Sequence, residues 1–178
     1  VAFGHRRLKI IDLSDRAQQP MVDSELGLAI VFNGCIYNYR ELRAELSGMG
    51  YRFFSEGDTE VLLKAYFEWG EDFVKRLNGM FAFAIWHEKG GDVLLGRDRF
   101  GITPLYYAQA GKRLRFASSL PALLQAGDID TSIDRVALHH YMTWHAVVPS
   151  PRTILHGARK LPPATISTVE PEGTTHDR

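Results

Sequence analysis

The chain has 178 residues, 45% of them hydrophobic and 11% aromatic, and 21 lysines and arginines balance 21 aspartates and glutamates. This composition excludes an intrinsically disordered chain, and the balanced charge gives no electrostatic basis for binding nucleic acid or an anionic membrane. The length suits one domain, or one domain with part of another.

Other simple features of the sequence favour a reducing, cytoplasmic location. The single cysteine, Cys35, excludes a disulfide framework and a zinc site built on several cysteines. No apolar stretch approaches the roughly 20 residues that span a bilayer. The residues after Val1 lack the pattern of a signal peptide.

The two ends of the sequence indicate a fragment. The chain opens at Val1 rather than at a methionine, and residues 170–178 are polar. We therefore expect the chain to be a piece of a longer protein at both ends.

The first elements predicted along the chain are a strand and a helix. Residues 27–32 form a short apolar run, typical of a buried strand, which ends at the turn signal Asn33–Gly34. Asn38 and Glu41 have the spacing of a helix N-cap and its capping-box acid. This spacing predicts a helix that runs to about Ser47.

A second helix and a set of strands follow. Residues 58–69 predict a helix because acidic side chains begin it and apolar side chains recur at helical spacing. Phe73, Val74 and Leu77 indicate another short helix. Strand-like runs then come at residues 80–86, 92–97, 105–108 and 113–117. Gly90–Gly91 between the first two of these is typical of a hairpin turn.

The last third of the chain differs in character. Pro121 and Gly127 bound a short predicted helix, and residues 136–144 are also typical of a helix. Four prolines between residues 149 and 163 then predict a loop-rich tail. We place a domain boundary near Asp128–Asp134. Strands and helices come in blocks, which favours an α+β fold with mostly antiparallel sheets.

Residue types alone leave the chemistry open. Asn33–Gly34 is either a turn or an oxyanion hole, where a side-chain amide and a backbone N–H face one developing charge. Arg7 and Asp58 are either solvated charges or a clamp on the two ends of an α-amino acid. Arg97–Asp98–Arg99 is either an anion site or an ion-paired turn. Cys35 is interpreted as a packed thiol, and the histidines lack metal-ligand spacing, so no metal site is predicted.

Five long motifs resemble the asparagine synthetase family. They are GHRRLKIIDLS at 4–14, NGCIYNYREL at 33–42, DTEVL at 58–62, RLNGMFAFAIW at 76–86 and RDRFGITPLYY at 97–107. Their collinear order over nearly the whole chain is far more specific than any short pattern. The resemblance implies a class II glutamine amidotransferase domain, an N-terminal-nucleophile (Ntn) hydrolase with an α/β/β/α sandwich.

The resemblance also implies an activity and a set of site residues. In this family an N-terminal cysteine attacks the side-chain amide of glutamine, and ammonia passes to an ATP-dependent domain that adenylates a carboxylate. Arg7 would hold the carboxylate of glutamine, Asp58 its ammonium, and Asn33 with Gly34 the oxyanion. The implied glutamine-binding residues are Arg7, Leu8, Lys9, Ile10, Ile11, Asn33, Gly34, Cys35 and Asp58.

The chain departs from the family pattern in two ways. The resemblance puts the nucleophilic cysteine a few dozen positions before Val1, so we expect the chain alone to be inactive. Cys35 stands where the family usually has Glu, so it does not take the nucleophile's role.

We expect residues 1–130 to be the amidotransferase domain and residues 131–178 to be a linker and the beginning of the synthetase domain. ATP and Mg²⁺ would bind the missing part of that second domain.

The acceptor of the ammonia is a finer expectation. NGCIYN and the segment HHYMTWHAVVP at 139–149 resemble the branch that makes N-acetylglutaminylglutamine amide, an osmoprotectant. The expected partners are L-glutamine, an acceptor carboxylate and a second copy of the chain, with no nucleic acid or membrane. Two alternatives stay open: a glutamine-hydrolysing asparagine synthetase acting on aspartate, and a non-catalytic glutamine-binding module.

Overall fold

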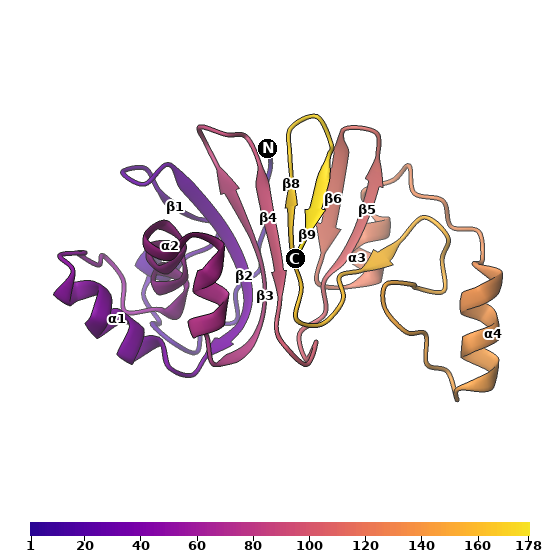
Figure 1. Ribbon diagram of the computed structural model, residues 1–178, viewed down its shortest axis with the longest axis horizontal. Helices are drawn as coiled ribbons and strands as arrows, with labels where there is room; N and C mark the ends of the chain where they lie inside the picture. The colour runs from indigo at the N-terminus through magenta and orange to yellow at the C-terminus, as the bar shows by residue number, and fades with distance from the viewer.

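Two antiparallel sheets with helices on their outer faces form the body of the protein, in a computed structural model that describes all 178 residues (Figure 1). The first sheet has the order β1 (Met21–Asp23), β2 (Leu28–Ile36), β3 (Gly79–His87), β4 (Val93–Arg97), β8 (Ile166–Val169) and β9 (Thr175–Asp177). The second has the order β6 (Arg113–Ala117), β5 (Tyr106–Ala110) and β7 (Arg159–Lys160). The helices are η1 (Asp15–Ala17), α1 (Tyr39–Gly48), α2 (Asp58–Trp69), η2 (Gly70–Arg76), α3 (Leu120–Leu124) and α4 (Arg135–Thr143).

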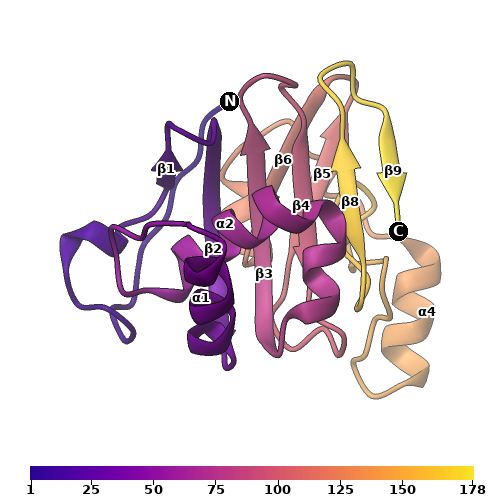
Figure 2. The ribbon, with the colours of Figure 1, turned by 60° about the vertical axis from the view of Figure 1, so that its left-hand side comes forward.

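Three apolar clusters hold these layers together. The largest lies between the first sheet and the helices α1 and α2, which stand in front of that sheet in Figure 2. Leu28, Ile30 and Phe32 of β2 face this cluster, while Val31 faces a second cluster between the two sheets. A third cluster joins the second sheet to α3. Both faces of β2 are therefore covered, which explains its uninterrupted apolar run. The helix–sheet–sheet–helix order confirms the predicted α/β/β/α sandwich.

Most predicted elements form within a few residues of their expected positions, but Asn33–Gly34 is not a turn. The strand β2 continues through both residues to Ile36, and Gly34 pairs with Phe81 of β3. A Cβ atom on Gly34 would lie 2.1 Å from the carbonyl oxygen of Met80, and its φ of 147° is one that other residues rarely adopt. The glycine is thus needed for the close approach of two strands, which in sequence looks the same as a turn signal.

The predicted capping box at α1 is wrong as well. Asn38 does precede the helix, but its side chain makes no capping hydrogen bond. Its Nδ2 instead donates to the carbonyl of Arg76, and its Oδ1 accepts from the N–H of Asn78. The side chain thereby connects the start of α1 to the chain that enters β3, a tertiary contact that local spacing does not reveal.

The end of the chain is less separate than predicted. β8 pairs with β4 and β7 pairs with β5, and the buried Leu161 belongs to the cluster between the sheets. Residues 159–178 therefore contribute strands to both sheets, and the division into residues 1–130 and 131–178 stays a prediction. The helix α4 does expose apolar side chains, with Met142 at 74%, and its assignment to a second domain stays a prediction. No helix is long and apolar enough to cross a membrane.

Candidate active site

A cavity of about 460 Å³ lies where the N-terminal segment, the end of β2 and the start of α2 meet. All of the residues predicted to bind glutamine line it except Lys9. The Lys9 ammonium instead forms an ion pair with Asp15, with 2.8 Å between Nζ and Oδ1. Residues from three distant parts of the sequence thus converge on one cavity, as the resemblance predicts.

The free edge of β2 forms one wall of this cavity. The N–H of Phe32 donates to Gln19 Oε1 at 2.6 Å, and the N–H of Ile36 donates to Asp58 Oδ2 at 3.1 Å. Backbone N–H groups two residues apart point to the same side of a strand. The N–H of Gly34, midway between the two, is therefore directed into the cavity, where no side chain takes the place of Gln19 or Asp58.

Asn33 stands beside this N–H group. Its backbone pairs with Ala82 of β3, so the strand holds its position without any help from the side chain. The residue is exposed and lines both this cavity and a second one of about 410 Å³ between the sheets. An amide side chain next to a free backbone N–H is the donor pair that an oxyanion hole requires.

Arg7 is held by the backbone of its own segment. Its Nη2 donates to the carbonyl of Ile11 at 2.5 Å and to the carbonyl of Asp12, and its Nη1 donates to the carbonyl of Ser14 at 3.3 Å. A guanidinium has five N–H donors, so these bonds orient the group and leave donors free for a ligand in the cavity.

Asp58 is a buried carboxylate, 6% exposed, in the first turn of α2. Burial raises its pKa above the ordinary value for aspartate, and the N–H groups of Ile36 and Thr59 and the charge of Arg7 oppose that rise. An acidic group at a helix N-terminus is also stabilised in its charged form by the helix dipole. A cavity with a cation on one wall and a carboxylate on another matches the zwitterionic end of an α-amino acid.

The environment of Cys35 does not activate its thiol. Burial and the nearby charge of Asp58 both raise the pKa of Cys35 above its ordinary value. A nucleophilic cysteine needs the opposite, a cation or a base that favours the thiolate. Cys35 therefore lines the cavity as a neutral thiol.

Arg97 and Asp98 organise a loop. Asp98 accepts hydrogen bonds from the N–H groups of four residues, Phe81, Phe100, Ile102 and Thr103. Burial alone would raise the pKa of Asp98, but these four donors bring it below its ordinary value. Arg97 donates to three backbone carbonyls rather than to Asp98. The turn predicted at this motif is confirmed, but backbone hydrogen bonds and not an ion pair stabilise it.

His5 and Gln19 are two of the cavity residues that had no predicted role. His5 lines both cavities, and burial lowers its pKa. Gln19 bridges the edge of β2 and Thr59 of α2, with 3.4 Å from its Nε2 to Thr59 Oγ1. Both residues lie in or beside the GHRRLKIIDLS motif, so the signal was present in the sequence without indicating what the side chains do. No group of three or more His, Cys, Asp or Glu side chains is placed to hold a metal ion.

Comparisons with known proteins show the family to which the chain belongs. The profile of a family described as a glutamine amidotransferase domain matches residues 1–178. The chain is 44% identical over 174 residues to glutamine-hydrolyzing asparagine synthetase 1 of Bacillus subtilis (strain 168), covering 97% of this chain and 27% of that protein. It is 37% identical to putative glutamine-hydrolyzing asparagine synthetase 2 of Methanocaldococcus jannaschii, covering 90% of this chain and 34% of the relative. The chain thus spans about a quarter to a third of the length of these relatives.

A solved structure shares the fold. It is glutamine phosphoribosylpyrophosphate amidotransferase from B. subtilis in complex with ADP and GMP. The two align with a TM-score of 0.66 and 20% sequence identity, over 98% of this chain and 33% of the other. At 20% identity, the similarity supports a shared fold and nothing further.

Proposed function

The chain belongs to the glutamine amidotransferase domain family, of the asparagine synthetase type, and we propose that its cavity binds L-glutamine and supports hydrolysis of the side-chain amide. One observation carries the proposal: a single cavity gathers Arg7, the buried carboxylate of Asp58 and the free strand edge at Asn33–Gly34. The first two complement the charged end of glutamine. The strand edge at Asn33–Gly34 supplies hydrogen-bond donors for the side-chain amide oxygen of glutamine, which gains negative charge during hydrolysis.

The mechanism follows from these positions. The free N–H donors of Arg7 bind the carboxylate of glutamine, and Asp58 binds its ammonium. A cysteine thiolate from outside these residues attacks the amide carbon, and the negative charge that moves to the amide oxygen is stabilised by Asn33 Nδ2 and the Gly34 N–H. The nitrogen takes up the proton that the thiol lost on forming the thiolate, the C–N bond breaks and ammonia leaves. Water then hydrolyses the thioester to glutamate and the free thiol.

We propose that the ammonia reaches an acceptor bound by a further domain of the full-length protein. We propose an ATP- and Mg²⁺-dependent amidation of an adenylated carboxylate, with N-acetylglutaminylglutamine as acceptor, supported by the NGCIYN and 139–149 segments. The names of the relatives instead favour aspartate. Product analysis of the full-length protein with each acceptor, glutamine and ATP decides between them. The single cysteine fits a reducing compartment, so we place the reaction in the cytoplasm.

Replacing Arg7 with lysine tests the clamp. We expect Arg7→Lys in the full-length protein to raise KM for glutamine strongly, because an ammonium cannot reproduce the planar set of donors. Synthesis from added ammonia is expected to continue, because it bypasses the glutaminase site. Arg16→Lys, the same change in an exposed helical turn outside the cavity, is the matched control. Equal loss of glutamine- and ammonia-dependent synthesis in Arg7→Lys would mean that the arginine is structural.

The thiol of Cys35 gives a second test. We expect the chain Val1–Arg178 not to hydrolyse glutamine, because its only thiol is held neutral beside Asp58. Alkylating Cys35 is therefore expected to leave any background release of ammonia unchanged. The measurement is ammonia release before and after treatment, with mass spectrometry to verify the modification. Glutaminase activity that disappears on alkylation would show that Cys35 is the nucleophile after all.

A further inference from the structure

The segment that carries Arg7 has no regular structure of its own. The chain runs to η1 at Asp15 without a helix or a strand, so individual side-chain contacts hold it in place, among them the packing of Phe3 against Phe116. The hydrogen bonds of Arg7 run to carbonyls within the same segment, at Ile11, Asp12 and Ser14. They shape the segment but do not attach it to the rest of the protein.

Asp12 supplies such an attachment. Its Oδ1 accepts from the N–H of Ser14 at 2.9 Å within the segment, and its Oδ2 accepts from the N–H of Glu56 at 2.7 Å across to the loop before α2. These hydrogen bonds hold the pKa of Asp12 below its ordinary value. The residue has a φ of 52°, a left-handed conformation that few residues other than Gly, Asn and Asp adopt readily. The carbonyl of the same residue accepts from Arg7 Nη2.

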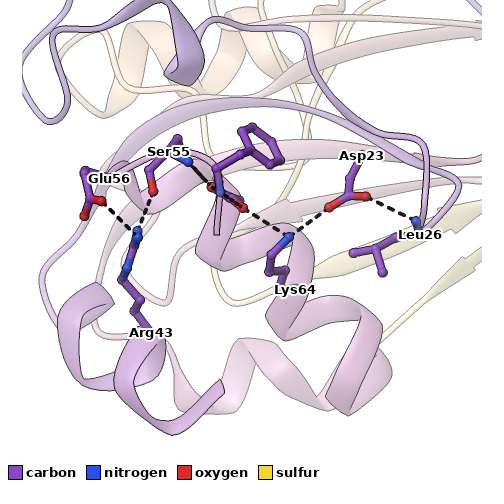
Figure 3. A network of polar contacts seen from close by, with 8 residues as sticks. Asp23, Leu26, Arg43, Ser55, Glu56 and Lys64 are labelled. Carbon is purple, nitrogen blue, oxygen red and sulfur yellow. Dashed lines mark hydrogen bonds and ion pairs between the residues drawn. The ribbon is translucent and has the colours of Figure 1, made fainter. Parts of the chain in front are cut away.

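The loop that receives this hydrogen bond is itself firmly held, as Figure 3 shows. The fully buried carboxylate of Glu60 accepts from the N–H groups of Phe54 and Ser55 and from the Ser55 hydroxyl. The ammonium of Lys64 lies 3.1 Å from Glu60. From the other side, Arg43 Nη1 donates to the carbonyl of Ser55 at 2.6 Å. The loop at residues 54–57 therefore leads rigidly into α2, whose first residue is Asp58.

We propose that Asp12 is a positioning residue that sets the separation between Arg7 and Asp58. Its carboxylate fastens the arginine-bearing segment to the loop before Asp58, and its carbonyl orients the guanidinium. The two groups that hold the opposite ends of glutamine come from segments far apart in sequence, and Asp12 contacts both segments. This inference rests on the proposed function, because it concerns the same glutamine site.

Asp12→Asn is the variant that tests the proposal, in the full-length protein. Asparagine tolerates the left-handed conformation, but its amide has one oxygen where the carboxylate has two, so its NH₂ must face the N–H of either Ser14 or Glu56 and two donors meet. We expect KM for glutamine to rise about 10- to 100-fold, as for the loss of one hydrogen bond to a charged group, with kcat nearly unchanged. Ammonia-dependent synthesis and the melting temperature are expected to stay near the wild-type values. Asp15→Asn removes a charge from an exposed position of the same region and is the control.

A double-mutant cycle separates action through Arg7 from a general effect. If Asp12 acts by positioning the guanidinium, Asp12→Asn adds little to the KM of Arg7→Lys, whereas independent effects multiply. An unchanged KM in Asp12→Asn, a multiplied effect in the double variant, or a parallel loss of both activities with a lower melting temperature overturns the positioning role. If wild-type protein releases no ammonia from glutamine, the proposed function fails together with this inference. Wild-type glutaminase with a raised KM in Arg7→Lys alone leaves the function intact and refutes only the role of Asp12.

Discussion

Replacing Asn33 with alanine is expected to lower kcat for glutamine hydrolysis by about 100-fold or more, with little change in KM. The side-chain amide is proposed to donate to the amide oxygen of glutamine, an interaction that strengthens only as that oxygen becomes negatively charged. Because the strand β2 holds Asn33 through its backbone pairing with Ala82, we expect the variant to fold normally. Steady-state ammonia release by the full-length protein measures the effect.

Asn33→Asp makes the test sharper. Aspartate keeps the size of the side chain but places a negative charge beside the developing oxyanion, so we expect it to be as inactive as the alanine variant while remaining folded. Ammonia-dependent synthesis in both variants reports on the rest of the enzyme and is expected to persist. Near-normal glutaminase activity in Asn33→Asp would refute the oxyanion hole. A loss of both activities with a destabilisation of ~0.5–3 kcal/mol would point to a purely structural role for Asn33.

The sequence predicts the elements of this fold well where periodicity is long and buried. The helix α2 begins at Asp58, and β3 extends one residue beyond the predicted 80–86 at each end, as their patterns indicate. Prediction from the sequence fails where a residue contacts a partner that is distant in the chain. Gly34 resembles a turn residue because nothing local distinguishes a left-handed φ in a turn from one that accommodates a neighbouring strand. β8 has only four residues and follows the proline-rich stretch 149–163, so its pairing with β4 has no local signal.

The candidate site shows the same division. Residue chemistry alone leaves Arg7 and Asp58 as either surface charges or a clamp, and only the family resemblance joins them in one site. The structure brings them to one cavity, which the spacing of the two residues cannot predict. Asp12 receives no role from the sequence, because its function depends on a hydrogen bond to Glu56, which follows from the tertiary fold.

The buried charges that hold the loop before Asp58 lead to the second large prediction. The ammonium of Lys64 lies 2.9 Å from Asp23, a contact drawn in Figure 3, and 3.1 Å from Glu60. The side chains of Lys64, Asp23 and Glu60 are 6%, 8% and 0% exposed. The Glu60–Lys64 spacing of four residues is visible in the sequence and is typical of an exposed helical ion pair. The third member, Asp23, comes from β1. The three side chains form a buried network with two carboxylates and one ammonium, which the spacing on the helix does not reveal.

Lys64→Met is therefore expected to lower the free energy of unfolding by about 3–5 kcal/mol, because it leaves two buried carboxylates without a cation. Urea unfolding followed by tryptophan fluorescence measures the change in midpoint at constant slope. Lys75→Met, which removes an exposed lysine paired with Asp72, is the control and is expected to lower stability by less than about 1 kcal/mol. Adding Asp23→Asn to Lys64→Met is expected to recover part of the loss, since it removes one uncompensated charge. A loss in Lys64→Met no larger than that in Lys75→Met would mean that the buried carboxylates and the loop before Asp58 do not depend on this lysine.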